Sequence, residues 1–157
     1  MKAAIVLKAG LAPVYGDFKE PIPAPGETRI AVVAAALSPV VKARAAGSHY
    51  SSPTDFPFVV GIDGVGRLDD GRRVYFILPK APFGSMSQTA VVPSSQCVIL
   101  PDGLDDITAA AIANPGLSSW AALKGARPIC ARRNDPNQWR NWNVRPLGRS
   151  NRKILGR

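Results

Sequence analysis

The stretch PAPGETRIAVVAAALSP, residues 23–39, places one long apolar run between two interruptions of regular structure. Prolines and a glycine come first and predict a turn or an extended loop. Thr28–Leu37 is mostly β-branched or apolar and predicts a β-strand. Ser38 then offers an N-cap before a proline at the first helical position, and Gly47 offers a left-handed stop. A two-turn helix is therefore expected over Pro39–Ala46.

Apolar runs separated by turn residues continue on both sides of this stretch. The clearest local signal is a hairpin, in which the runs Phe58–Leu68 and Arg73–Leu78 are joined through Asp-Asp-Gly at residues 69–71. The Asp-Gly pair tolerates the positive φ of a tight turn. These runs predict a mainly β fold with short helices, with further strands over Ala3–Leu7, Met86–Val92 and Cys97–Leu100.

The segment after these strands is alanine-rich and predicts helices. The dipeptide Asp105-Asp106 opens a helix that runs through Ala113, because its negative charges suit the positive N-terminal dipole. Pro115 starts another helix, which is expected to carry Trp120 and Leu123 inward.

Length and composition restrict the possible classes of protein. The 157 residues suffice for one ordinary domain, and no apolar run approaches the roughly 18 residues of a membrane span. The first ten residues hold too short an apolar core for a signal peptide, which predicts a cytoplasmic protein with no membrane partner. Cys97, Cys130 and a single histidine cannot make a disulfide framework or a Cys/His zinc site, so no metal is expected.

The net charge of +9 comes entirely from one end of the chain. Residues 1–123 carry ten basic and ten acidic side chains, whereas residues 124–157 carry ten basic side chains against Asp135 alone. The second part also shows neither helical nor strand periodicity. The sequence therefore predicts a folded domain over 1–123 and a basic, disordered segment over 124–157.

Five motifs follow one another in residues 1–123: MKAAIV, PAPGETRIAVVAAALSP, PFVVGIDGVGR, LPDGL and AAAIANPGLSSWAAL. Each motif is weak alone, but the ordered set is specific. It resembles the GroES-like substrate domain of medium-chain dehydrogenases/reductases, in the zinc-independent, quinone oxidoreductase-like branch. The resemblance implies a GroES-like partial β-barrel, of the type that forms the N-terminal domain of alcohol dehydrogenases.

The resemblance also implies a reductase without zinc. Zinc-dependent relatives have a cysteine ligand where this chain has Ser38, and Gly-His-Glu where it has Gly-Ile-Asp at 61–63. Neither a hydroxyl nor Ile62 replaces these ligands. In the family, a separate Rossmann domain binds NADPH, and the small-molecule substrate is a quinone or an enone. We expect this chain to bind no cofactor by itself, because no G-x-G-x-x-G follows Leu123.

Residues from about 125 onward are interpreted as the product of a frameshift. Trp has the single codon TGG, so a forward shift of one base turns each Trp codon into a glycine codon. Trp139 and Trp142 then become glycines three positions apart, and Arg145 followed by Pro146 permits a third. Residues 135–138 permit a strand that leads into these glycines, which is the context of a dinucleotide-binding fingerprint. The chain is therefore interpreted as a truncated family member that is inactive alone.

The resemblance suggests residues for the substrate and cofactor cleft, although no catalytic residue is assigned. Ser38 stands where zinc relatives place a ligand, but it also stands at a helix start, and capping is the favoured role. Tyr50 matches the family's aromatic position near the nicotinamide, whereas His49 is interpreted as a solvated loop histidine. Asp63 stands at the family's buried glutamate, where a structural carboxylate is favoured over an acid–base catalyst.

Two more cleft residues are expected near the end of the similar region. Asn114 and Ser118 lie in the segment that approaches the nicotinamide in relatives. Asn114 precedes Pro115 and is equally interpreted as a helix cap.

Two other classes of function stay open at this point. The basic segment, with Trp139 and Trp142, could bind nucleic acid through phosphate contacts and stacking, although no specific nucleic-acid partner is expected. Alternatively, the chain could be a β-barrel interaction module that has kept the fold and lost the chemistry. Dinucleotide binding distinguishes the reductase from both, and salt-dependent retention on DNA identifies the nucleic-acid class.

Overall fold

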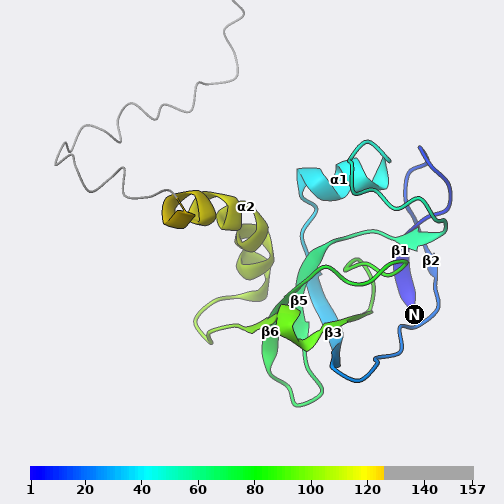
Figure 1. Cartoon of the computed structure of the whole chain (residues 1–157). Helices are drawn as coiled ribbons and strands as arrows, with labels where there is room; N and C mark the ends of the chain where they lie inside the picture. The colour runs from blue at the N-terminus through cyan, green and yellow to red at the C-terminus, as the bar shows by residue number, and fades with distance from the viewer. Residues whose placement is uncertain (126–157) are drawn as a thin grey trace, which may run out of the picture. The chain divides into compact units, whose positions relative to one another are not determined.

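The apolar run after the proline-rich loop forms β3 (Glu27–Ala35) in the computed structural model, which describes residues 1–125 (Figure 1). This strand pairs antiparallel with β5 (Asp63–Arg67) on one side and with β7 (Thr89–Pro93) on the other. β6 (Arg73–Ile77) and β8 (Cys97–Ile99) extend the sheet beyond β5. The result is a five-stranded sheet in the order β7-β3-β5-β6-β8.

A second, three-stranded sheet is built around β1 (Lys2–Val6). β1 pairs antiparallel with β2 (Val14–Asp17) and with β4 (Phe58–Val59). With the strands curled into a partial barrel, the predicted mainly β class is confirmed.

The segment 86–88 joins the two sheets between their named strands, and Met86 hydrogen-bonds to the smaller one. Its carbonyl accepts the Ala4 N–H at 2.8 Å, and its own N–H donates to the Val60 carbonyl at 2.8 Å. An isolated antiparallel bridge between Ala3 and Ser87 continues the same contact. Gln88 makes the link to the larger sheet, because its carbonyl accepts the Val32 N–H of β3 at 3.0 Å while its own N–H donates to the Lys2 carbonyl of β1 at 3.0 Å. The segment that precedes β7 therefore hydrogen-bonds to both sheets.

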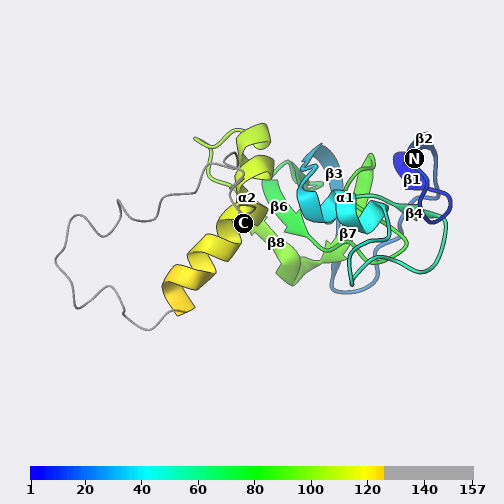
Figure 2. The ribbon, with the colours of Figure 1, turned by 90° about the horizontal axis from the view of Figure 1, so that it is seen from above.

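Two α-helices accompany the sheets among residues 1–125 (Figure 2). α1 (Pro39–Ala45) begins as predicted with proline in its first turn, and Gly47 follows it with a φ of 75°. The Gly47 N–H donates to the Arg44 carbonyl and the Ser48 N–H to the Ala43 carbonyl, which is the Schellman pattern of a helix end. α2 (Asp106–Gly125) follows β8, which is itself preceded by a 3-10 turn at Ser94–Gln96.

Each helix packs small or branched side chains against the sheets. α1 buries Val41 and Ala45 beside the β4 region. α2 packs Ala109 and Ala110 on Val65 and Tyr75 of the larger sheet. These alanines are at most 4% exposed, so the helix approaches the sheet closely at its first turns. Residues Met1–Trp120, which include these contacts, form one compact unit.

The hairpin predicted around Gly71 is confirmed. β5 and β6 pair from Asp63–Ile77 to Arg67–Arg73, and Gly71 has a φ of 86°. The Leu68 N–H donates to the Arg72 carbonyl at 3.0 Å, which closes the turn. A left-handed backbone at this position explains why the sequence places glycine there.

Three predicted elements differ from the observed ones. The run 58–68 is not one strand, because Gly61 turns the chain with a φ of 107° and sends β4 and β5 to different sheets. The strand expected over 86–92 is regular only from Thr89, because Met86 hydrogen-bonds to Ala4 and Val60 on the side of the smaller sheet before the chain joins β3. β2 was not predicted, since its sequence, Val-Tyr-Gly-Asp, has only two β-favouring residues.

The two helices predicted at the end are one continuous helix, α2, with Pro115 inside it. Alanine-rich neighbours keep the helix going although proline lacks an N–H for the helical ladder. Trp120 is 60% exposed, so the prediction that it points inward is wrong. The side chain of Leu123 and the basic segment from 126 onward lie outside the described residues.

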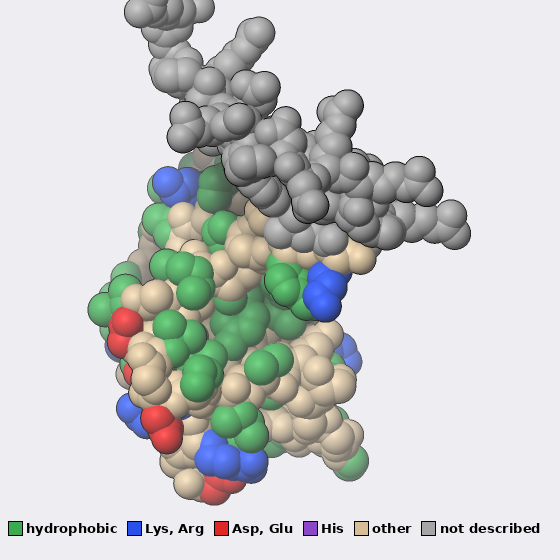
Figure 3. All heavy atoms as spheres, turned by 90° about the vertical axis from the view of Figure 1, so that its left-hand side faces the viewer, with side chains coloured by type: hydrophobic (Ala, Val, Ile, Leu, Met, Phe, Trp, Pro, Cys, Tyr) green, Lys and Arg blue, Asp and Glu red, His purple; other side chains and the backbone are tan. Residues whose placement is uncertain are grey.

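Surface apolar side chains gather on one face of the described residues (Figure 3). Figure 3 shows them as a continuous green area with charged side chains at its borders. On α2 itself, Ile107, Ile112 and Leu117 are each about half exposed or more. Within residues 1–125, no helix combines the length and the apolar character needed to cross a lipid bilayer.

We expect Arg73→Met to weaken the fold. Arg73 donates to the Asp106 carboxylate at 2.8 Å and to the Leu104 carbonyl, and both charged side chains are about one-fifth exposed. The substitution leaves the half-buried Asp106 without this partner, so the free energy of unfolding should fall by about 2 kcal/mol. Urea unfolding followed by circular dichroism measures the change.

Arg72→Met is the matched control for this prediction. Arg72 pairs with Asp70 at a similar distance, 2.7 Å, but about half of each side chain is exposed. Its loss should leave the urea midpoint close to that of the unchanged chain, because solvent screens the pair. Equal losses for the two variants would contradict the structural role given to Arg73.

Candidate functional site

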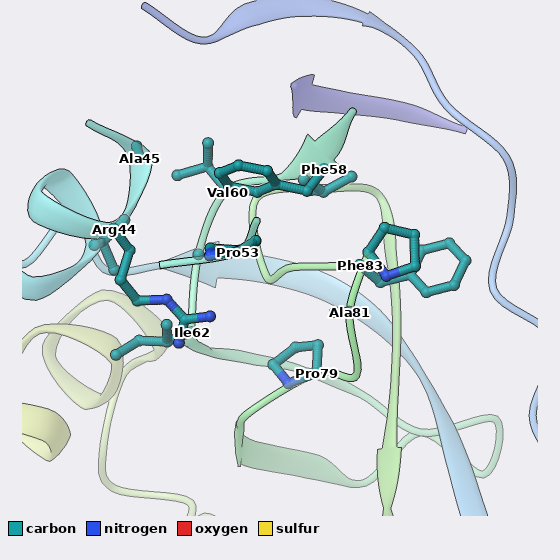
Figure 4. Close-up of a pocket in the computed structure, with 13 residues that line it drawn as sticks. Arg44, Ala45, Pro53, Phe58, Val60, Ile62, Pro79, Ala81 and Phe83 are labelled. Atoms are coloured by element: carbon teal, nitrogen blue, oxygen red, sulfur yellow. The ribbon is translucent and has the colours of Figure 1, made fainter. Parts of the chain in front are cut away.

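A small cavity of about 30 Å³ lies beside α1 (Figure 4). Its wall comes from four parts of the chain: one face of α1, Pro53 in the loop after α1, the segment from β4 to Ile62, and the loop after β6. Phe58, Val60, Ile62 and Pro79 make most of this wall apolar. The cavity therefore encloses about as much space as two water molecules need, among side chains that offer them few hydrogen bonds.

Arg44 is the charged residue in the wall of this cavity. Figure 4 shows its side chain extending from α1 toward Ile62. Its guanidinium has no hydrogen bond or ion pair with any other residue of the described chain. Burial lowers the pKa of Arg44, because partial removal from water disfavours the charged form and no carboxylate compensates for it.

The sequence analysis did not identify Arg44 as a site residue and counted it only among the ten basic side chains of residues 1–123. A signal was available in the helical spacing of the predicted helix. Arg44 and Ala45 follow Val41 by three and four residues, so all three lie on one helix face. The two apolar residues of this face, Val41 and Ala45, are buried. A cation on the apolar face of a short helix is the pattern that would have identified it.

A buried carboxylate lies on strand β5, which begins directly after Ile62 in the wall of the Arg44 cavity. Asp63 is fully buried, and its Oδ2 accepts a 2.9 Å hydrogen bond from the Tyr75 hydroxyl on β6. Asn114 on α2 lies close enough to affect the same carboxylate, although Oδ1 has no hydrogen bond of ordinary geometry within residues 1–125. Burial raises the pKa of Asp63, while the hydrogen bond from Tyr75 and the nearby amide of Asn114 oppose that rise. Burial, and next the negative charge of Asp63, also raise the pKa of Tyr75.

Ser38 occupies the N-cap position of α1, but the predicted capping role of its side chain is wrong. Its hydroxyl makes no capping hydrogen bond and is buried without a partner among the described residues. Pro39 follows it and has no N–H, which leaves one donor fewer to satisfy at this helix start. The Ser38 hydroxyl therefore points into the protein rather than along the helix.

The other predicted cleft residues lie apart from the Arg44 cavity, since neither they nor Ser38 line it. Tyr50 is 96% exposed and lies against His49 with 4.3 Å between ring centres, while His49 hydrogen-bonds Ser51. Asn114 lies inside α2, so its interpretation as a helix cap is wrong, and Ser118 is exposed on the same helix. Of the predicted set, the structure brings Asn114 to another candidate residue, Asp63.

The residues at the position of the zinc relatives' site do not form a zinc-binding set. Ile62 has no donor atom, and the Asp63 carboxylate is held by Tyr75. Across residues 1–125, no three His, Cys, Asp or Glu side chains lie together as they would around a metal ion.

The described residues also lack a helix N-terminus that fits the pyrophosphate of a dinucleotide. A pyrophosphate needs free N–H groups at a helix N-terminus with glycines beside it. At the start of α2, the Asp105 carboxylate already accepts the Thr108 N–H, and Asp106 adds a second negative charge. Residues 1–125 therefore do not fit NADPH by themselves, and no step through it is derived from them.

Comparison with known proteins gives a consistent result, although no family model matches the chain. The "Probable NADPH-dependent quinone reductase tdiC" of Emericella nidulans is 28% identical to it, over 71% of this chain and 40% of that protein. The quinone oxidoreductase of Thermus thermophilus, solved also in complex with NADPH, is 30% identical with a TM-score of 0.72, over 82% of this chain and 42% of that one.

A second solved structure shows the same fold at lower identity. The quinone oxidoreductase of Pseudomonas syringae gives a TM-score of 0.70 at 24% identity, over 82% of this chain. The chain spans about two-fifths of the length of each of these relatives. Its homologues are NADPH-dependent quinone oxidoreductases of the medium-chain dehydrogenase/reductase family, and it has the GroES-like fold of their N-terminal domain.

Proposed function

We propose that residues 1–123 are the substrate-binding domain of a zinc-independent, NADPH-dependent reductase of quinones or enones. The observation that carries this proposal is the 30% identity and TM-score of 0.72 with a quinone oxidoreductase of known structure. The domain brings an apolar cavity and a half-buried cation, and the cofactor has to be held by a dinucleotide-binding domain outside residues 1–125.

The proposal includes the origin of residues 124–157. We interpret them as a frameshift product, because the two Trp codons become glycine codons at the spacing of a glycine-rich turn when the frame moves forward by one base. In this proposal the exposed Tyr50 and Ser118 face the dinucleotide-binding domain across the cleft, while Ser38, whose hydroxyl is buried, and Asn114 shape the cleft wall from within the domain. Asn114 has support from its proximity to the buried Asp63, which would fix it on α2.

The experiment compares the 157-residue chain with a chain whose frame is restored through the codons of Trp139 and Trp142 and whose downstream sequence is included. The restored chain should oxidise NADPH in the presence of a simple quinone, and the 157-residue chain should not, because positioning two reactants accounts for most of such a rate. Fluorescence titration with NADPH should show binding by the restored chain alone.

The control is a restored chain in which the glycine encoded at position 139 is replaced by valine, which should abolish NADPH binding because the backbone no longer approaches the pyrophosphate. Turnover by the 157-residue chain would show that it is a complete enzyme. A restored chain that binds NADPH but reduces neither quinones nor enones would contradict the substrate class.

A further inference from the structure

Among residues 1–125, the Arg44 guanidinium has no counter-charge. The ion pairs of the described residues use the other arginines, Arg29, Arg67, Arg72 and Arg73, and each of those faces a carboxylate. Arg44 is half-buried and faces an apolar wall instead. A cation partly removed from water and left unpaired costs free energy, which a bound anion would recover.

The shape of the cavity restricts what the anion can be. Its volume of about 30 Å³ is of the order of two water molecules, and a carboxylate has two oxygens. Arginine binds a carboxylate through two parallel N–H···O hydrogen bonds in one plane. A ring or a nucleotide does not fit this volume, so only the charged group of a larger ligand can enter.

A larger groove offers a place for the rest of such a ligand. This groove has a volume of about 710 Å³ and shares Pro53, Ala81 and Pro82 with the wall of the Arg44 cavity. Phe18 and Phe56 also line it, so much of its surface is aromatic or apolar, while Asp17, Lys19 and Asp55 add charged groups to the same wall. A ligand that is charged at one end and apolar at the other therefore matches both spaces.

We propose that Arg44 binds the carboxylate of an organic acid in this cavity, with the apolar body of the acid along the groove that shares Pro53 and Ala81. The site lies in residues 1–125 and needs no NADPH. Carboxylate binding at Arg44 can therefore be tested independently of the proposed reductase function, and a negative result for one leaves the other unaffected.

The test titrates the 157-residue chain with benzoate, and in parallel with benzamide, at constant ionic strength. NMR detects the Arg44 Nε–Hε signal and the signals of residues in the cavity wall. Benzoate should shift the Arg44 signal in a saturable way, whereas the neutral benzamide should not. No saturable shift with benzoate would overturn the proposal. Saturation by inorganic phosphate at lower concentration than benzoate would overturn the carboxylate class.

Arg44→Met removes the charge and keeps a long apolar side chain against Val41 and Ile62. The Arg44→Met chain should have a Kd for benzoate at least about tenfold higher than the unchanged chain, because charge-assisted hydrogen bonds to the carboxylate are lost. Its Tm should rise, because an unpaired, half-buried cation is gone. Unchanged benzoate affinity, or a Tm that falls, would each contradict the assignment of Arg44 to ligand binding.

Lys42→Met is the matched control. Lys42 is exposed on the same helix and does not line the Arg44 cavity. The Lys42→Met substitution removes one positive charge from the same region, so this variant measures any non-specific electrostatic attraction of benzoate. Its Kd should stay within about twofold of the unchanged chain. A loss equal to that of Arg44→Met would show that only net charge attracts the acid.

Discussion

A chain that carries Gly66→Val should not fold. Gly66 lies in β5, between its partners Val32 on β3 and Val74 on β6. A Cβ at this position would lie 2.4 Å from the Ala31 carbonyl oxygen and 2.4 Å from the Ile30 side chain. The Ala31 carbonyl oxygen is backbone of the neighbouring strand β3 and cannot move without disturbing the ladder, and the Ile30 side chain is fully buried with no space to move into. The cost should exceed about 4 kcal/mol, a large part of the whole stability of a small domain.

The measurement is circular dichroism together with the dispersion of amide signals in NMR. Gly103→Ala is the control, because a Cβ at Gly103 meets nothing within 4 Å and its φ is not left-handed. The control should unfold within about 0.5 kcal/mol of the unchanged chain. A Gly66→Val chain with dispersed signals and an unchanged urea midpoint would show that β5 is not packed against β3 as described.

Asp63→Asn should remove a pH dependence from the stability of the protein. Because burial raises the pKa of Asp63 in the folded state, the folded chain holds a proton that the unfolded chain has already released. Stability is then greatest below the unfolded pKa, near 3.8, and falls as the pH rises toward the raised value. Asparagine carries no charge and can still accept the Tyr75 hydroxyl, so it should stabilise the protein increasingly over this interval.

The limiting slope for one proton is about 1.4 kcal/mol per pH unit. Urea midpoints of the two chains measured from pH 4 to pH 7 give the difference directly. Tyr75→Phe should extend the decline to higher pH, because it removes a hydrogen bond that holds the folded-state pKa of Asp63 down and leaves the unfolded-state pKa, where the decline begins, unchanged. A difference between Asp63→Asn and the unchanged chain that is the same at every pH would disprove the burial of a titrating carboxylate.

The hairpin at Gly71 and the short helix before Gly47 could be predicted because turn chemistry is local. An Asp-Gly pair and a Ser-Pro pair constrain the backbone of their own neighbours, and the structure has both elements. Gly61 shows the limit of this reasoning. It looks like part of one apolar run, and its turn is visible only when Ser85 and Met86 pack against it from a distant segment.

The candidate site was less predictable than the fold. The resemblance pointed to Ser38 and Tyr50, whereas the cation without an ion pair among residues 1–125 is Arg44. Whether an arginine is paired depends on the tertiary placement of carboxylates, which its local sequence does not show. Helical spacing predicts a shared face for Val41 and Arg44, but not that a loop of prolines closes over that face. The pairing of Asp63 with Tyr75 follows from the hairpin register, while the approach of Asn114 depends on the continuous α2.

The hydrogen bonds at Met86 have a consequence for how the molecule opens. A two-sheet protein can in principle lose one sheet while the other persists, as two separate cooperative units. Here Met86 is hydrogen-bonded to Ala4 and Val60 on the side of the smaller sheet, and two residues later the Gln88 carbonyl accepts the Val32 N–H of the larger sheet. Neither sheet can therefore detach without exposing backbone groups of the other. Partial opening of one sheet alone is thus disfavoured, and the two sheets unfold as one unit.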